Sequence, residues 1–336
     1  MIEGHGDDLY SYGGKIKYNF SSNIFSGVDH SRLTNYMASF GMGLDSYPEP
    51  NVISLEEKLA GCLGVNRDNV MVSNGATEAI YMIAHSFKND RSAVVIPSFS
   101  EYEDACVMYD HDVEYVTSID DMPDDVSVVW LCNPNNPTGK VYPKGRLMEV
   151  IESNKDITFV IDQAYADYTV CPVVSDSEAV KDGNVLLLGS FTKRFSVPGL
   201  RVGYMVGDKD LVRRVKSYRL PWSVGGPAMA GAKYLIDHIT DYTIDVNGLH
   251  CEALRLADEF FRLGISVEPT DCNFILCKLP VGCASELKDY LALKHGILIR
   301  DASNFRGLDS AYFRVAAQTQ DANDILISAV KEWITL

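Results

Sequence analysis

Short apolar runs alternate with amphipathic stretches through the first two thirds of the chain. The runs are rich in Val, Ile and Leu and predict strands at 69–73, 92–97, 113–116, 127–132, 158–162, 185–190 and 202–206. Apolar residues at helical spacing predict helices at 31–40, 54–63, 79–87, 98–109, 144–154 and 209–218. Strands joined by helical crossovers form a parallel or mixed sheet that is buried on both faces. The pattern therefore predicts an α/β fold, with a mixed, mostly parallel sheet flanked by helices.

Sequence signals for the ends of helices are clear in one segment of this region, and no regular pattern is found in another. Ser54 and Glu57 have the spacing of a capping box at the start of the helix at 54–63, and Gly64 suits its end. After Tyr165 no periodic pattern stands out, and we expect a loop as far as the strand at 185–190.

The alternating pattern breaks at 221–227, where two prolines and two glycines occur within seven residues. A long helical stretch follows at 227–263, with a break near 245–248. Strands are predicted at 265–268, 273–277, 297–300 and 311–316, and helices at 284–295 and 322–334. We therefore expect a large domain at 31–225 and a smaller α+β domain at 226–336. Residues 1–30 are rich in Gly, Ser and Asn and predict an arm that packs with the small domain, without a packed element of its own.

Composition excludes several classes of protein. The formal charge of −16 argues against nucleic acid or an anionic membrane as a partner. No run of about 18 apolar residues suggests a membrane span, and the polar, acidic opening does not resemble a signal peptide. The eight cysteines are scattered without a C-x-x-C pair, so we expect reduced thiols, no metal site and a cytoplasmic location. An acidic protein must bind phosphorylated molecules through locally placed cations and backbone N–H groups.

One cluster follows the strand at 185–190. Lys193 could condense with an aldehyde to form an imine, while Ser190 and Arg201 could bind a phosphate. An aldehyde and a phosphate on one small molecule describe pyridoxal 5′-phosphate. A single lysine in such a place is more often an exposed loop residue, so the interpretation depends on the rest of the chain.

Other polar and aromatic residues follow the ends of the predicted strands, where ligands bind in doubly wound sheets. The backbone N–H groups of Ala76 and Thr77 would bind a phosphate at a helix N-terminus. Asp162 would pair with the pyridine nitrogen, and Phe99 would lie against the ring. Asn136 and Tyr165 would hydrogen-bond the phenolate oxygen. Each residue alone has an ordinary structural alternative, such as a helix cap, a turn or a core position.

Four motifs together resemble the aminotransferase family of pyridoxal-phosphate fold type I. They are Asn74-Gly-Ala-Thr, Asn133-Pro-Asn-Asn-Pro-Thr-Gly, Asp162-x-Ala-Tyr and Ser190-x-x-Lys-x-x-x-x-Pro-Gly-x-Arg. The resemblance covers the whole chain and implies a cofactor joined to Lys193. It points to two branches, the threonine-phosphate decarboxylases of cobalamin synthesis and the histidinol-phosphate aminotransferases.

Several segments are more similar to the decarboxylase branch, among them Phe20-Ser-Ser-Asn23 and Pro221-Trp-Ser-Val224. By this resemblance Arg314 would bind the substrate carboxylate, and Asn136 would contact the substrate as well as the cofactor. The phosphate of the substrate would be bound by a set from the arm and the small domain, namely His5, Gly6, Asn23 and Arg300. Tyr47 would reach the cofactor phosphate of the neighbouring subunit, which implies a homodimer with shared active sites.

The arm also departs from that branch. Asp7 and Asp8 follow Gly6 where Gly-Asn is usual, Ile24-Phe-Ser-Gly replaces I-N-P-x-G, and Gln163 replaces a Glu. Two acidic residues beside a phosphate site would weaken it unless they point away. The expected function is decarboxylation of L-threonine O-3-phosphate. The alternatives are a histidinol-phosphate aminotransferase and a non-catalytic binding protein that kept the fold.

Overall fold

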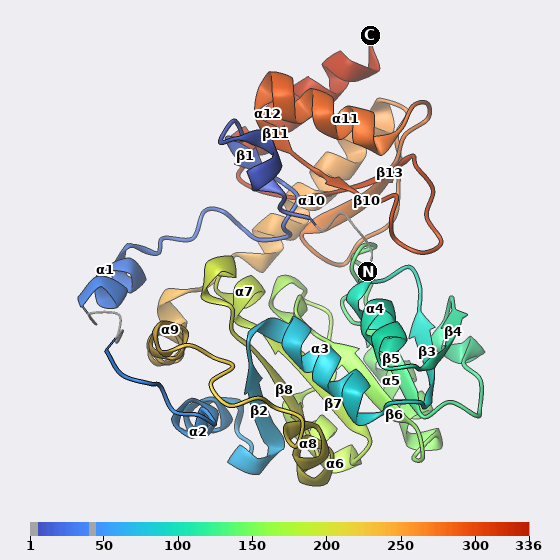
Figure 1. Ribbon diagram of the computed structural model, residues 1–336. Helices are drawn as coiled ribbons and strands as arrows, with labels where there is room; N and C mark the ends of the chain where they lie inside the picture. Colours follow the sequence, from blue (N-terminus) through green and yellow to red (C-terminus); the bar gives the residue numbers. More distant parts are fainter. Residues whose placement is uncertain (1–5, 40–44, 336) are drawn as a thin grey trace.

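The computed structural model describes residues 6–39 and 45–335. A large domain built on one sheet lies below a smaller domain with its own sheet, and part of the N-terminal arm lies beside the small domain (Figure 1). Within the described ranges, every helix is too short or too polar to span a bilayer. The same ranges contain no group of three or more His, Cys, Asp or Glu residues that could hold a metal ion.

The large domain is organised around a seven-stranded sheet with the order β2-β8-β7-β6-β5-β3-β4. Its strands are β2 (Val70–Ser73), β3 (Arg91–Val95), β4 (Asp112–Val116), β5 (Val128–Cys132), β6 (Thr158–Asp162), β7 (Val185–Ser190) and β8 (Gly203–Gly207). β8 runs antiparallel to both β2 and β7, and the other neighbouring pairs are parallel. The prediction of a mixed, mostly parallel sheet is confirmed.

Helices cover both faces of this sheet (Figure 1). α3 (Gly75–Ser86), α4 (Glu101–Met108) and α8 (Lys209–Lys216) share one core with side chains such as Trp130, whereas α5 (Lys144–Ser153) and α6 (Asp176–Asp182) share another with Leu131. Successive residues of a strand point to opposite faces, which explains why the central strands are continuous apolar runs. The carboxyl ends of β5, β6 and β7 are thereby fixed at one edge.

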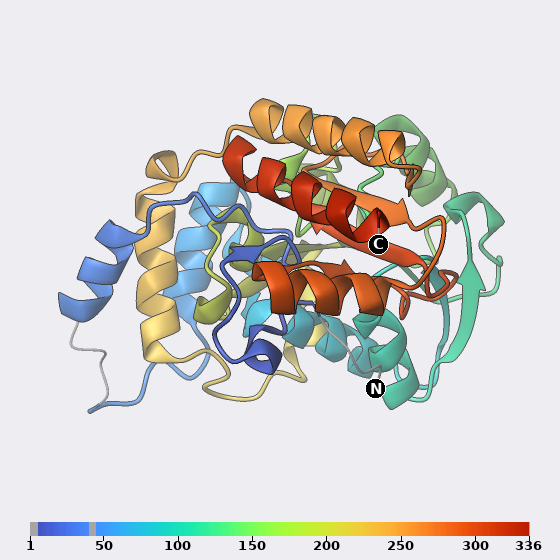
Figure 2. The same ribbon diagram turned by 90° about the horizontal axis from the view of Figure 1, so that it is seen from above.

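The small domain has a four-stranded antiparallel sheet with the order β12-β13-β10-β9. The strands are β9 (Ser266–Val267), β10 (Phe274–Lys278), β12 (Arg300–Asp301) and β13 (Tyr312–Ala316). Three helices pack on it, namely α10 (Val246–Arg262), α11 (Ala284–Tyr290) and α12 (Gln320–Ile334), as Figure 2 shows. A π-helical turn, Leu291–His295, continues α11.

The expectation that the arm has no packed element is wrong. Tyr18 and Asn19 form β1, which pairs in parallel with β11 (Ile297–Leu298). Phe20 is fully buried in the core of the small domain. The single strand expected at 297–300 is therefore two strands, because β11 pairs with the arm while β12 pairs with β13.

The helix α9 (Gly226–Asp237) packs against the large domain rather than against the small one. This helix lies against α1 (Ser31–Ser39) and α2 (Ile53–Leu63), and its Met229 and Leu235 share a core with Leu55 of α2. The residues of the small-domain core begin later, in α10. By its cores, the chain therefore changes from one domain to the other within α10, where Leu249 belongs to a core of the large domain and Ala253 to that of the small domain.

Two local predictions are corrected. α2 begins at Ile53 without a side-chain cap, because the backbone N–H of Ser54 donates to Glu49 (2.9 Å) and the Ser54 hydroxyl also bonds that carboxylate. The loop expected after Tyr165 contains α6, which begins with a capping box formed by Ser175 and Glu178.

Candidate active site

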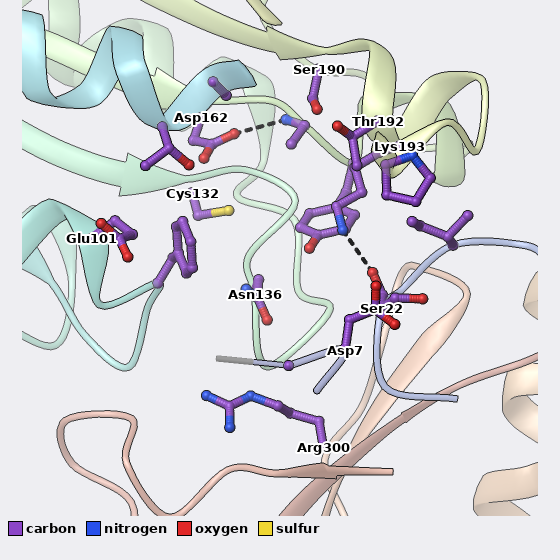
Figure 3. A pocket seen from close by; sticks show the side chains of 18 of the residues that line it. Asp7, Ser22, Glu101, Cys132, Asn136, Asp162, Ser190, Thr192, Lys193 and Arg300 are labelled. Atoms are coloured by element: carbon purple, nitrogen blue, oxygen red, sulfur yellow. Dashed lines mark hydrogen bonds between the residues drawn. The ribbon is translucent and has the colours of Figure 1, made fainter. Parts of the chain in front are cut away.

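A cavity of about 350 Å³ opens where β5, β6 and β7 end, between the two domains and the arm (Figure 3). Twelve of the residues singled out in the sequence line it: Gly6, Ala76, Thr77, Phe99, Asn136, Asp162, Tyr165, Ser190, Lys193, Arg201, Arg300 and Arg314. They come from segments far apart in the chain, and the strand ends bring them together.

Three other predicted residues remain, of which two do not line this cavity and one has no described position. His5 lies outside the described residues. Asn23 is fully buried in the arm near Tyr165, where burial raises the pKa of the Tyr165 phenol and Arg314 and Asn23 oppose that shift. Tyr47 is 87% exposed, and its ring centroid lies 5.4 Å from that of Trp222. Tyr47 therefore lies outside the cavity of its own chain.

Lys193 belongs to the single helical turn α7 (Phe191–Arg194) that follows β7 directly. Its amine donates a 2.7 Å hydrogen bond to the carbonyl oxygen of Ser22 and lies 5.5 Å from the centroid of the Tyr165 ring. Burial lowers the pKa of Lys193 to about 7, helped by the positive charge of Arg314 and opposed by Asp7 and Asp162. Near neutral pH a large share of this amine is uncharged and can act as a nucleophile or a base.

Asp162 ends β6 and is 5% exposed. Its Oδ1 accepts a hydrogen bond from the Ala164 N–H (2.9 Å), and its Oδ2 accepts one from the Tyr102 hydroxyl (2.7 Å). Burial raises the pKa of this carboxyl, while the two donors and Lys193 act in the opposite direction. A buried carboxylate at the edge of a cavity suits a cationic, hydrogen-bonding partner such as a protonated ring nitrogen.

At the start of α3, two glycines allow Arg201 and the backbone of a neighbouring strand to approach closely. Gly75 has a φ of +75°, and a Cβ atom there would collide with the guanidinium of Arg201. A Cβ on Gly203, in the neighbouring strand β8, would collide with the backbone nitrogen of Ala76. The first N–H groups of a helix have no partner within the helix. With Arg201 beside them, the N–H groups of Ala76 and Thr77 suit a phosphate group.

Two arginines face each other on adjacent strands of the small domain. Arg300 of β12 is paired in register with Arg314 of β13, and both are buried. Arg314 donates to the Ser21 carbonyl (2.5 Å) and to the side-chain oxygen of Asn136. Arg300 donates to the Asp301 carbonyl (2.6 Å) and to Asn304 Oδ1 (2.7 Å).

Neither arginine forms a salt bridge with a carboxylate of the described chain, and the Arg314 Nε is buried without a hydrogen-bond partner there. Burial lowers the pKa of both groups, that of Arg314 to about 10. Guanidinium groups stay charged at neutral pH in proteins. Asp301 and Asp8 act on Arg300 only at longer range, and buried charges without a salt bridge favour the binding of anions. This wall of the cavity can therefore bind two negative groups.

The two acidic residues of the arm behave differently. Asp8 forms a 2.7 Å ion pair with Lys288 of α11, whereas Asp7 lines the cavity and accepts a hydrogen bond from the Asn19 amide. Gln163 points to the opposite side of the sheet edge, where its amide donates to the Val174 carbonyl (2.9 Å). Of the departures noted in the sequence, only Asp7 adds a negative charge to the cavity.

Sequence reasoning missed Tyr102, Thr192 and Cys132, all of which line the cavity. Thr192 Oγ1 accepts from Arg201 (3.3 Å), and Cys132 lies opposite Asp162 in the sheet register. Cys132 ends a predicted strand, as Asp162 does, so its position could have identified it. Tyr102 is the second residue of α4, which begins at Glu101 and leaves Phe99 outside the helix, so no helical spacing in the sequence identifies it.

These features fit pyridoxal phosphate: a concave phosphate site, a buried carboxylate, an aromatic residue and a lysine of lowered pKa in one cavity. Residues 15–330 match the model of the family described as aminotransferase class I and II. A histidinol-phosphate aminotransferase of Thermoanaerobacter pseudethanolicus is 31% identical over 85% of this chain and 84% of its own length.

Two solved structures are also similar. The crystal structure of L-threonine-O-3-phosphate decarboxylase from Porphyromonas gingivalis has a TM-score of 0.92 and 34% identity, covering 95% of this chain and 100% of that one. A histidinol-phosphate aminotransferase from Sinorhizobium meliloti, in complex with pyridoxal-5′-phosphate, has the same fold (TM-score 0.84, 17% identity, covering 97% of this chain and 93% of that one). The chain therefore belongs to the aminotransferase class I and II family of pyridoxal-phosphate-dependent enzymes.

Proposed function

We propose that this enzyme decarboxylates L-threonine O-3-phosphate to aminopropanol phosphate. The observation that carries the proposal is the buried pair Arg300 and Arg314, whose charges lack carboxylate partners within the described chain. L-Threonine O-3-phosphate carries two anionic groups, a carboxylate and a phosphate. The likeness to the Porphyromonas gingivalis decarboxylase supports the same substrate.

Most of the cavity residues predicted from the sequence then have a role in binding or proton transfer. Ala76, Thr77, Ser190 and Arg201 would hold the cofactor phosphate, Asp162 the ring nitrogen and Phe99 the ring face. Asn136 and Tyr165 would form hydrogen bonds with the phenolate oxygen of the cofactor. Pyridoxal phosphate, when bound, accepts the electrons of a bond broken at the α-carbon of the substrate.

Each arginine of the pair would bind one anionic group of the substrate. Arg314 would hold the carboxylate, with Asn136 beside it, and Arg300 would hold the phosphate together with His5 and Gly6 of the arm. Asn23 does not line the cavity and is left out of this set. An added Cβ on Gly6 would lie 3.1 Å from Arg300 Cδ, so the arm runs close to this group. Lys193, with its pKa near 7, would carry a proton to or from the α-carbon. The position of the carboxylate decides which bond breaks, because the bond perpendicular to the ring breaks most easily.

The alternative is transamination of histidinol phosphate, which the Thermoanaerobacter pseudethanolicus relative supports. Histidinol phosphate has one anionic group, so it would leave one arginine of the pair without an anion. A dicarboxylic amino-group donor would occupy both arginines in the other half of that reaction. The arginine pair alone therefore favours the decarboxylase without excluding the transaminase.

The decisive experiment supplies the purified holoenzyme with O-phospho-L-threonine in the absence of any keto acid. We expect release of CO₂ and aminopropanol phosphate. A parallel assay supplies histidinol phosphate with 2-oxoglutarate. Turnover in the second assay but not in the first would overturn the decarboxylase proposal and favour the transaminase.

We also infer a homodimer with shared active sites, supported by the exposed Tyr47 and Trp222 beside each other. Tyr47 would reach the cofactor phosphate of the second subunit. Mixing Lys193→Ala with Tyr47→Ala subunits tests this, because a hybrid dimer contains one site with neither change. Activity that rises on mixing supports shared sites, and activity that stays at the level of the separate variants contradicts them.

A further inference from the structure

A buried tyrosine lies directly behind the carboxylate that faces the cofactor cavity. Tyr102 comes from α4 and Asp162 from the end of β6, and the tyrosine hydroxyl donates a 2.7 Å hydrogen bond to Asp162 Oδ2. The other carboxylate oxygen, Oδ1, accepts the backbone N–H of Ala164 at 2.9 Å. Each oxygen of the carboxylate is thus bonded by one donor of the protein.

The ring of Tyr102 is held firmly in place. The residue is 1% exposed. Its ring is stacked with that of Trp130, with centroids 6.0 Å apart and planes 19° apart, and meets Phe99 edge to face at 5.9 Å. A ring packed in this way cannot move its hydroxyl oxygen away from Asp162 without opening the core. The distance between that oxygen and the Asp162 carboxylate is therefore set by the fold.

The surroundings of Asp162 explain why this hydrogen bond affects the protonation of the carboxyl group. Cys132 lies opposite Asp162 in the sheet, and burial raises the pKa of the Asp162 carboxyl. The donors Tyr102 and Ala164 stabilise the ionised form. A bound pyridine ring accepts electrons best when its nitrogen is protonated. If Asp162 lost a donor, it would compete more strongly for that proton.

We propose that Tyr102 is a positioning residue that keeps Asp162 ionised, so that the proton between Asp162 and the cofactor stays on the ring nitrogen. The proposal rests on the cofactor-binding part of the proposed function and not on the choice of substrate. Tyr102 touches neither the reacting atoms nor the substrate in this account. It acts through the carboxylate in front of it.

The test compares wild-type holoenzyme with Tyr102→Phe, which removes the hydroxyl and keeps the ring. Both are loaded with pyridoxal phosphate labelled with ¹⁵N in the ring, without substrate. The ¹⁵N chemical shift distinguishes a protonated from a neutral pyridine nitrogen. We expect the variant to shift toward the neutral value and kcat to fall about 10- to 100-fold, as for the loss of one hydrogen bond to a charged group.

Tyr12→Phe is the matched control, because the Tyr12 hydroxyl donates a 3.0 Å bond to Asp289 on the small domain. It should leave the ¹⁵N shift and kcat unchanged. If Tyr102→Phe does not fold, Tyr102→His and Tyr102→Leu are compared instead, since only histidine keeps a donor. A protonated nitrogen with His and a neutral one with Leu supports the proposal.

Two results would count against the proposal, and they are distinguishable. A ring nitrogen as protonated in Tyr102→Phe as in the wild type, or equally protonated in the His and Leu variants, overturns the role of Tyr102 alone. Failure of the wild-type chain to bind pyridoxal phosphate would overturn the cofactor-binding function itself.

Discussion

The amine of Lys193 and the carbonyl oxygen of Ser22 are joined by a 2.7 Å hydrogen bond that spans 171 positions of the sequence. The contact ties the arm to the residue proposed to bind the cofactor. The acceptor of the amine is a neutral carbonyl group, not a carboxylate.

Replacing Lys193 by Ala should abolish the absorbance of lysine-bound cofactor near the visible edge. It should also lower turnover by at least about 100-fold, because both the nucleophile and the proton carrier are lost. Absorbance spectra and steady-state rates measure the two effects. Lys331→Ala, at an exposed position of α12, is the control and should change neither. A fully active Lys193→Ala enzyme would refute the assigned role.

The capture of pyridoxal phosphate by the cofactor-free protein should depend on pH with a midpoint near 7. Burial lowers the pKa of Lys193 to about 7, and only the uncharged amine attacks the aldehyde. The rate should therefore rise as pH increases through 7 and level off well below the pKa of an ordinary lysine, about 10.4. Stopped-flow absorbance gives the profile. A midpoint above pH 9 would show that the amine is not desolvated in solution.

Asp7→Asn should improve the affinity for a phosphorylated substrate roughly fivefold, as expected from removing about 1 kcal/mol of charge repulsion. The same change should move the midpoint for cofactor capture to lower pH, because Asp7 favours the protonated form of Lys193. KM for the substrate and the capture profile are the measurements.

Asp8→Asn provides the comparison, since Asp8 is paired with Lys288 and does not line the cavity. It should lower the stability of the arm and change KM less than Asp7→Asn does, since Asp8 acts on Arg300 only at a distance. Equal effects of the two substitutions on KM would mean that Asp7 does not act through its charge in the cavity.

Arg300→Ala should raise KM for the phosphorylated substrate about 10- to 100-fold, because hydrogen bonds to a charged group are lost. The dissociation constant of pyridoxal phosphate should stay as in the wild type, since Arg300 lies in the small domain, away from the start of α3. Substrate titrations and cofactor fluorescence separate the two quantities. An unchanged KM would remove Arg300 from the substrate site.

Gly75→Ala should weaken the binding of pyridoxal phosphate by about tenfold or more, because the new Cβ meets Arg201 and the backbone has a φ of +75°. The binding of pyridoxal, which lacks the phosphate, should change much less. Gly61→Ala is the control, since a Cβ there meets nothing within 4 Å. Equal losses for the two vitamers would indicate general damage rather than loss of the phosphate contact.

Much of the large domain could be predicted because its strands are buried on both faces. The run at 185–190 matches β7 from its first to its last residue. A short, continuous apolar stretch between polar residues is typical of a strand that is buried on both faces. Cavity residues at strand ends could be found for the same reason. The prediction that Ser54 caps a helix was wrong because Ser54 bonds to Glu49, which lies before the helix. The spacing of residues within the helix cannot show that contact.

The remaining features depend on contacts between distant segments. β1 has only two residues and exists because β11 is available beside it. The pairing of Arg300 with Arg314 depends on the register of two strands, and Tyr102 is recognisable only once α4 has packed against β6. Assigning α9 to a domain likewise required its neighbours α1 and α2.

The route of the arm links the two domains mechanically. Phe20 is anchored in the core of the small domain, and Ser22, its next neighbour but one, bonds to the lysine of the large domain. Any rotation of the small domain relative to the large one must therefore move the Ser22 carbonyl relative to the amine. The position of the small domain and the position of this hydrogen-bond acceptor are thus coupled through a short stretch of the arm.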